Sequence, residues 1–150
     1  MATDRALPRR AALGGALLAA SGLAARAAPP ALGFDALYKS IGVRGLVMSD
    51  RVTALAGSQV AMKGYMAPPL RAESRFFVLT REPLTLCPFC QSDAEWPVDI
   101  VVVYLRHEMP LLDGGTRLTV QGRLDIGSWT DPESGFVSLL RLVDASFRTA

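Results

Sequence analysis

Residues 117–124 read Arg-Leu-Thr-Val-Gln-Gly-Arg-Leu, and this stretch decides the fold. Apolar or small residues (Leu118, Val120, Gly122 and Leu124) alternate with polar ones. A period of two places the two kinds of side chain on opposite faces of a β-strand, one toward a core and one toward water. The stretch therefore predicts a half-buried strand.

Four further stretches carry the same alternation or a β-rich apolar run. They are residues 59–66, 76–80, 100–105 and 136–147. Turn-forming residues separate the runs, at Pro68-Pro69, at Asp113-Gly114-Gly115 and over residues 131–135. Five strands with short connections and no long helix between them argue against a parallel sheet.

Glycine lies inside two of these strands, in Val60-x-Met62-x-Gly64 and in Leu118-x-Val120-x-Gly122. Glycine weakens a strand, so its matching places indicate a sharply coiled sheet that closes on itself. We therefore expect a mainly β protein, a small five-stranded Greek-key barrel of the oligonucleotide/oligosaccharide-binding (OB) type. A half-open sandwich is the alternative.

Residues 1–27 have the pattern of a cleaved export signal. Arg5, Arg9 and Arg10 precede a short apolar stretch over residues 11–20, and Ala25-Arg26-Ala27 forms a small-x-small cleavage site. The adjacent arginines resemble a twin-arginine signal, with an ordinary secretory signal as the alternative. No later stretch approaches the roughly 20 apolar residues of a membrane span. We expect a bacterial protein that is periplasmic or secreted, with no membrane span in its mature chain.

Cleavage after Ala27 changes the charge balance. Four of the 16 basic residues and one of the 14 acidic residues lie in the signal, so the mature chain carries a net charge of −1. A nearly neutral domain has no electrostatic reason to bind nucleic acid. The remaining residues suffice for one domain with its own core.

Residues 28–57 are expected to form a helical preamble to the barrel domain, which occupies residues 58–150. Phe34, Leu37, Tyr38 and Ile41 fall at helical spacing in the first part. A second short helix is predicted from the capping residues 49–50 to residue 57.

The order of several short motifs resembles a family of exported bacterial proteins that is known only as a domain of unknown function. These motifs, spread between residues 55 and 147, are Gly64-Tyr65-Met66-x-Pro68, Phe76-Phe77-Val78-Leu79, a cysteine-containing loop, Ile100-Val101-Val102-Val103, and Val120-x-Gly122-x-Leu124-x-x-Gly127. The resemblance implies a small exported β domain with cysteine in the loop before the third strand. It also implies an association with metal or ABC-type transport systems, and no established activity.

The two cysteines of the chain occur as Cys87-Pro88-Phe89-Cys90, in the long connection between the second and third expected strands. A loop of this length in a compact domain is usually functional. Two thiols at this spacing can share a metal, form a disulfide or exchange electrons. An exported protein meets an oxidising compartment, so a Cys87–Cys90 disulfide that only shapes the loop is one reading.

A metal site is the second reading. Zinc would need further ligands, for which Asp93 and Glu95 are the candidates, whereas Cu(I) would accept the two thiolates with few other soft ligands. Met62 and Met66 are more readily explained as core residues. The only histidine, His107, lies beyond the far end of the third expected strand.

Thiol–disulfide exchange is the third reading, because Cys-Pro-Phe-Cys looks like the active-site sequence of glutaredoxin-type enzymes. Those enzymes place the motif at the start of a helix, which lowers the pKa of the first thiol. Here Pro97 leaves room for barely one helical turn after Cys90, and acidic residues nearby oppose a thiolate.

We therefore expect a non-enzymatic binding or accessory protein without catalytic residues, which binds zinc, copper or a protein partner of a transport system through the cysteine loop. The aromatic residues Phe89, Trp96, Tyr65 and Trp129 are expected to form its binding surface. Asp125, Asp131 and Glu133 flank a turn and are expected to be solvated loop charges.

Overall fold

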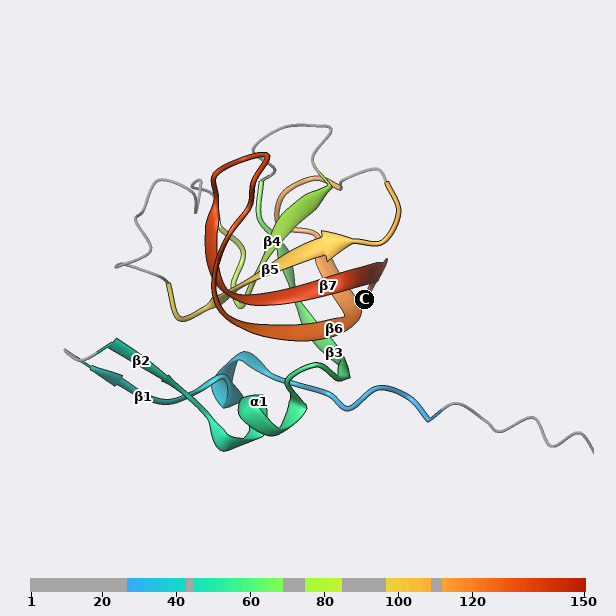
Figure 1. The fold of residues 1–150 in the computed structure, drawn as a ribbon. Helices are drawn as coiled ribbons and strands as arrows, with labels where there is room; N and C mark the ends of the chain where they lie inside the picture. The colour runs from blue at the N-terminus through green and yellow to red at the C-terminus, as the bar shows by residue number, and fades with distance from the viewer. Residues whose placement is uncertain (1–26, 43–44, 69–74, 85–96, 109–111) are drawn as a thin grey trace, which may run out of the picture.

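The computed structural model describes residues 27–42, 45–68, 75–84, 97–108 and 112–150. Strands predominate, as the sequence predicts, and Figure 1 shows their arrangement. In chain order the elements are a 3₁₀ turn η1 (Phe34–Ala36), β1 (Tyr38–Gly42), β2 (Gly45–Met48), α1 (Asp50–Leu55), β3 (Gln59–Met66), β4 (Phe76–Thr80), β5 (Ile100–Leu105), β6 (Arg117–Thr130) and β7 (Val137–Thr149).

Five of the strands form a closed barrel in the order β3-β4-β5-β7-β6, and β6 closes it by pairing with β3. Neighbours are antiparallel with one exception: β7 lies between β5 and β6 and runs parallel to β5. The sequence argues against a parallel sheet, and this is the one parallel pair among the five barrel strands. The chain returns from the end of β6 directly into β7, so the parallel neighbours are not consecutive strands and need no crossover helix between them.

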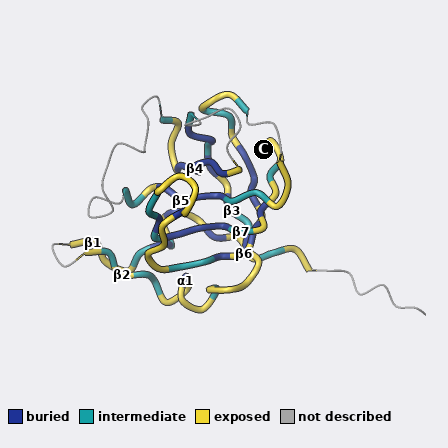
Figure 2. Tube along the Cα trace, turned by 45° about the horizontal axis from the view of Figure 1, so that its top comes forward, coloured by how far each residue is buried: buried dark blue, intermediate teal, exposed yellow. Residues whose placement is uncertain are grey.

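Alternation along the strands builds the core inside the barrel. Phe77 and Leu79 of β4 and Val101 and Val103 of β5 point inward with Val120 of β6, and all are almost completely buried. Figure 2 shows that buried positions follow the barrel strands. Burial of such side chains stabilises a domain by about 1.5–3 kcal/mol each, so this interior is the main source of stability.

The outer face of β4 and β5 is buried as well. Phe76, Val78, Ile100 and Val102 form a second apolar cluster with Ala67. Tyr38 and Leu46 from the β1–β2 ribbon pack against this cluster, as do Phe136, just before β7, and Leu139 of β7. Both faces of these two strands are therefore covered, which explains their continuous apolar sequence.

Gly64 and Gly122 lie where the barrel strands approach one another most closely. A Cβ atom on Gly64 would come within 2.5 Å of the Thr80 carbonyl oxygen, and one on Gly122 would come within 3.0 Å of the Ala145 Cβ. The pairing of β6 with β7 also shifts register at Gly122. These contacts confirm that the two strand glycines serve the coiling of a closed sheet.

The first predicted helix, over residues 34–42, is wrong. Only Phe34–Ala36 forms a 3₁₀ turn, and the chain then becomes strand β1, which pairs antiparallel with β2. Leu32, Phe34 and Leu37 insert into the barrel core, whereas Ile41 is 63% exposed. The helical spacing was misleading because these apolar side chains serve different surfaces, and tertiary packing overrides so weak a local signal.

The second predicted helix is confirmed as α1. The Ser49 hydroxyl accepts a hydrogen bond from the Val52 backbone N–H at 3.1 Å and donates one to the Ala36 carbonyl oxygen at 2.6 Å. Val52 is completely buried in the barrel core. Figure 1 shows this short helix beneath the barrel. Its buried side chain and its cap fix it there.

Candidate functional site

The predicted cysteine loop leaves and re-enters the barrel at one place, the paired ends of β4 and β5. Thr80 and Ile100 are partners in the antiparallel ladder. The backbone N–H of Arg81 donates to the Asp99 carbonyl oxygen at 3.0 Å, and the two side chains form an ion pair of 3.7 Å. The base of the loop is therefore a continued hairpin, and it holds the two ends of the loop together.

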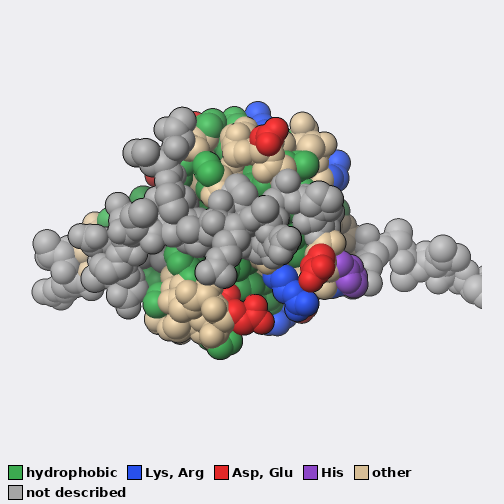
Figure 3. Space-filling model, turned by 90° about the horizontal axis from the view of Figure 1, so that it is seen from above, with side chains coloured by type: hydrophobic (Ala, Val, Ile, Leu, Met, Phe, Trp, Pro, Cys, Tyr) green, Lys and Arg blue, Asp and Glu red, His purple; other side chains and the backbone are tan. Residues whose placement is uncertain are grey.

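Most residues of the predicted site lie outside the described residues. They are Cys87, Phe89, Cys90, Asp93, Glu95 and Trp96. Among the residues that the structure describes, no group of three or more His, Cys, Asp or Glu side chains is placed to hold a metal ion. Seen from above, the described surface carries acidic and basic side chains close to one another (Figure 3).

The other ligand candidates weighed in the sequence are described. Met62 and Met66 are at most 1% exposed and belong to the barrel core, as expected for alternate residues of a strand. His107 is exposed and follows β5, whereas the cysteine loop joins β5 at Ile100. A strand of six residues spans roughly 20 Å, so His107 lies far from the base of the loop.

Two residues of the predicted aromatic surface, Tyr65 and Trp129, do not lie together. Tyr65 pairs with Thr80 at one end of β4, and its ring lies 5.9 Å from the Arg117 guanidinium carbon. Trp129 contacts Tyr104, which pairs with Phe76 at the other end of β4. The two ends of β4, Thr80 and Phe76, are four residue steps apart, or roughly 13 Å along the strand.

Trp129 instead belongs to an aromatic cluster on the outer side of the barrel. Its ring meets Tyr104 edge-on with centroids 5.3 Å apart, and Tyr104 lies 5.3 Å from Phe76. Phe76 in turn stacks on Phe136 at 5.9 Å. Trp129 is the member at the surface, 39% exposed, so it alone offers a broad apolar edge to a binding partner.

A buried carboxylate anchors this cluster. Asp131 is 6% exposed and accepts hydrogen bonds from the Tyr104 hydroxyl at 3.0 Å and from the backbone N–H groups of Glu133 and Ser134. Burial alone would raise the pKa of Asp131, but these hydrogen bonds lower it below its ordinary value. Burial, reinforced by the Asp131 charge, raises the pKa of Tyr104 well above the ordinary value.

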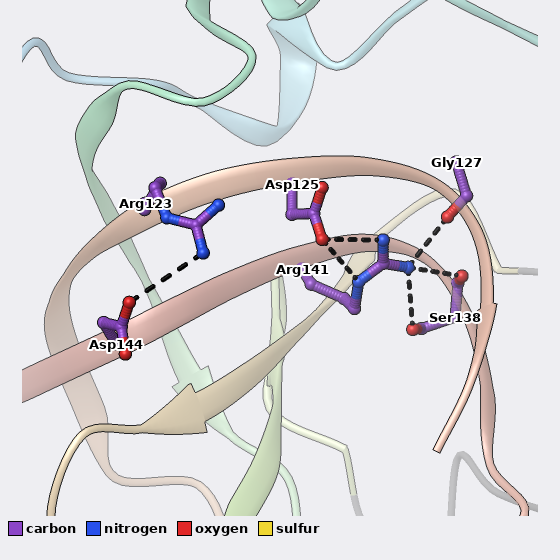
Figure 4. Close-up of polar contacts among 6 residues, drawn as sticks. All are labelled: Arg123, Asp125, Gly127, Ser138, Arg141 and Asp144. Carbon is purple, nitrogen blue, oxygen red and sulfur yellow. Dashed lines mark hydrogen bonds and ion pairs between the residues drawn. The ribbon is translucent and has the colours of Figure 1, made fainter. Parts of the chain in front are cut away.

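The guanidinium of Arg141 lies beside this cluster and is buried; Figure 4 shows its polar contacts. It donates to the Asp125 carboxylate at 3.0 Å, to the Gly127 carbonyl oxygen at 2.8 Å and to the Ser138 carbonyl oxygen at 2.9 Å. Its carbon also lies 5.4 Å from the centre of the Trp129 ring. Because the β6–β7 ladder shifts register between Ile126 and Trp129, Arg141 supplies hydrogen bonds where backbone pairing is interrupted.

The expectation that Asp125 and Asp131 are solvated loop charges is therefore wrong. Asp131 is buried in the turn that it caps, and Asp125 is the counter-ion of a buried arginine. The only signal for Arg141 in the sequence is a single charged residue inside the otherwise uncharged and mostly apolar run Val137–Leu142. The sequence holds none for the contact with Asp125, which depends on the pairing register.

The part of the chain that the structure describes contains no helix long and apolar enough to cross a membrane. No protein-family model and no curated protein sequence matches the chain.

Among solved structures, the chain is similar to a crystal structure of a DUF3299 family protein, a domain of unknown function, from Pseudomonas aeruginosa PAO1. The two share 15% sequence identity with a TM-score of 0.52, and the likeness covers 83% of this chain and 97% of that one. This supports, at the level of the fold, the resemblance to a domain of unknown function. The chain thus shares its fold with a DUF3299 family protein.

Proposed function

We propose that this protein is an exported, non-enzymatic binding or accessory module, built on an OB-type Greek-key barrel. Its working surface is the loop between β4 and β5, which holds a metal ion or a periplasmic protein partner through Cys87 and Cys90. The order β3-β4-β5-β7-β6, with the last strand inserted between the third and fourth strands of the barrel, supports the OB-type assignment. A twin-arginine-like signal would deliver the domain to the periplasm.

The observation that carries this proposal is the direction of the strands on either side of the motif. β4 and β5 are antiparallel neighbours, joined at Thr80 and Ile100. In thiol–disulfide enzymes of the glutaredoxin type, the strand before the motif leads into a helix whose N-terminus stabilises the thiolate. Here the strands on either side of the motif, β4 and β5, are antiparallel neighbours in a closed barrel and not strands of a layered α/β sheet.

The chemistry of the loop fits a metal better than catalysis. Two thiolates at this spacing, with Asp93 and Glu95 close by in the sequence, form a donor set that suits zinc, and the thiolates alone suit Cu(I). Phe89 and Trp96 would give the loop an apolar surface for a partner. The ion pair of Arg81 with Asp99 at the loop base would limit the conformational freedom lost on binding.

Metal analysis and intact mass of the protein recovered from the periplasm of an expression host test the proposal. One equivalent of zinc or copper, lost in Cys87→Ser and in Cys90→Ser, would support a metal site. Asp93→Asn tests the predicted carboxylate ligand of the metal. Its matched control is Asp113→Asn, which changes an exposed carboxylate in the turn before β6. A mass two units below that of the dithiol, without metal, would instead identify the structural disulfide.

Thiol–disulfide oxidoreductase activity is the competing function, which the Cys-Pro-Phe-Cys motif favours. For this function to hold, the protein must reduce a test disulfide, and Cys87→Ser must abolish the turnover. Turnover at a rate well above that of free dithiol would contradict a non-enzymatic role.

A further inference from the structure

Basic side chains from three neighbouring strands, and one from just after a fourth strand, gather on one convex side of the barrel, which we call the basic face. Its cations are Lys63 of β3, Arg117 and Arg123 of β6, Arg148 of β7, and Arg106 just after β5. The strand register fixes this grouping, because Thr119 pairs with Lys63 on one side and with Arg148 on the other. These side chains alternate with buried residues such as Leu118 and Val120, so they point outward.

These cations are exposed and poorly neutralised. The only ion pair that the described residues make on the basic face joins Arg123 to Asp144 at 3.8 Å, with side chains that are 45% and 61% exposed (Figure 4). Such a pair contributes little attraction. The next carboxylate along β6, Asp125, is already bound by the buried Arg141. Positive charge therefore dominates this face of a chain whose mature form is nearly neutral.

A shallow groove of about 570 Å³ opens beside the cations. Its lining includes Pro30, Gln59, Arg106, Gln121, Asp144 and Ser146. The N-terminal segment forms one wall, because Pro30 and Leu32 are hydrogen-bonded to Ala61 of β3. The opposite wall carries amide, hydroxyl and guanidinium groups, which suit the oxygen atoms of a polar anionic group, and one carboxylate, Asp144, which forms an ion pair with Arg123.

We propose that the basic face docks the protein on a membrane surface of anionic phospholipid, with one phosphate-bearing headgroup entering the groove beside Arg106. Several separated cations on a convex surface suit many small anionic headgroups, each of which can move to meet a cation. Single-stranded nucleic acid would need exposed aromatic platforms among the cations. Tyr65 is the aromatic residue at this face, and the Arg117 guanidinium already lies over its ring. The predicted export signal would bring the protein to such a surface.

Co-sedimentation with vesicles of mixed phosphatidylglycerol and phosphatidylcholine, compared with pure phosphatidylcholine, tests this proposal. Binding should require phosphatidylglycerol and weaken as salt is added. Each cation removed should weaken partitioning about fivefold, so Lys63→Gln with Arg148→Gln should weaken it about 25-fold. Asp144→Asn should strengthen binding, and asparagine tolerates the positive φ of 51° at this position.

Lys39→Gln with Arg75→Gln is the matched control. Lys39 of β1 and Arg75, just before β4, are exposed cations outside the basic face, each in a surface ion pair, so the control removes the same charge from elsewhere. Every variant carries the same N-terminal segment, so the affinity of this segment for lipid cancels when variants are compared. Thermal unfolding shows whether each variant is folded. Equal losses in the test and control pairs, or equal binding to pure phosphatidylcholine, would overturn the proposal. So would binding to a single-stranded oligonucleotide without binding to the vesicles.

Discussion

At the scale of single residues, the buried guanidinium of Arg141 shows how a charged side chain holds the bent part of the β6–β7 pair. It satisfies the carbonyl oxygens of Gly127 and Ser138 and neutralises Asp125. An apolar side chain at this position would leave those acceptors without donors in a poorly hydrated place. The cost of losing one partner of a buried pair exceeds the net contribution of the pair itself.

Arg141→Ala is therefore expected to lower the free energy of unfolding by about 3 kcal/mol. Arg75→Ala, which breaks the exposed ion pair with Glu108, should change it by less than about 0.5 kcal/mol. Urea unfolding of both variants measures the difference. Similar midpoints for the two variants would show that burial of the guanidinium adds nothing to stability.

Tyr104 should remain protonated at a pH at which an unperturbed tyrosine, with a pKa of about 10, is half ionised. Its folded pKa is raised by burial and by the Asp131 charge. The stabilisation that follows is complete below the unfolded pKa and is lost as the pH rises through the folded pKa. A spectrophotometric titration of tyrosinate should show one late phase, which is absent in Tyr104→Phe and in denaturant. If the late phase persisted in Tyr104→Phe, it would belong to another tyrosine and the raised pKa of Tyr104 would be contradicted.

At the scale of elements, the coiling of the barrel strands depends on glycine at two close approaches. Gly64 faces the backbone of Thr80, which cannot move without opening the β3–β4 contact, whereas Gly122 faces side chains and a carbonyl oxygen at 3.0–3.2 Å. The two sites therefore differ in how readily their neighbours can adjust.

Gly64→Ala is expected to lower the free energy of unfolding by about 2–3 kcal/mol and Gly122→Ala by about 1 kcal/mol, because an added methyl group overpacks a close contact. Gly42→Ala is the control, because no atom lies within 4 Å of its added Cβ and its φ is not positive. Thermal unfolding of the three variants gives the order. A Gly64→Ala protein as stable as Gly42→Ala would contradict the close approach.

The elements also show why local pattern predicts some structure and misses the rest. The five barrel strands were predictable because each carries its own alternation or apolar run, and α1 because Ser49 is a strong cap. Residues 34–42 were not, because Phe34 lies in the barrel core, Tyr38 packs against both apolar clusters and Ile41 is exposed, an arrangement that only the folded barrel supplies. The contacts of Arg141 and the grouping of Lys63 with Arg148 depend on register, which no single stretch of sequence contains.

At the scale of the whole molecule, stability is unevenly distributed. The β6 and β7 strands share the longest ladder and enclose the core, whereas the β1–β2 ribbon pairs only with itself and exposes Ile41 and Val47. Local opening is easiest where few apolar contacts hold a pair of strands. The ribbon should therefore open without loss of the barrel.

Native-state hydrogen exchange should detect this difference. Amide protons of Ser40 and Leu46 are expected to exchange at least 100-fold faster than those of Val120 and Leu142, because ribbon opening needs only local unfolding. The amide of Val52, which is capped by Ser49 and buried beneath the barrel, serves as an internal reference. Uniform exchange across these sites would indicate that ribbon and barrel unfold as one unit.

The place of β7 between β5 and β6 has a consequence for biosynthesis. β7 is the last of the five barrel strands in chain order, so until it is synthesised the edges of β5 and β6 with which it pairs remain open. A nascent chain therefore cannot close the barrel before β7 has been made. If the leader uses the twin-arginine route, transport of the folded domain would have to wait for β7.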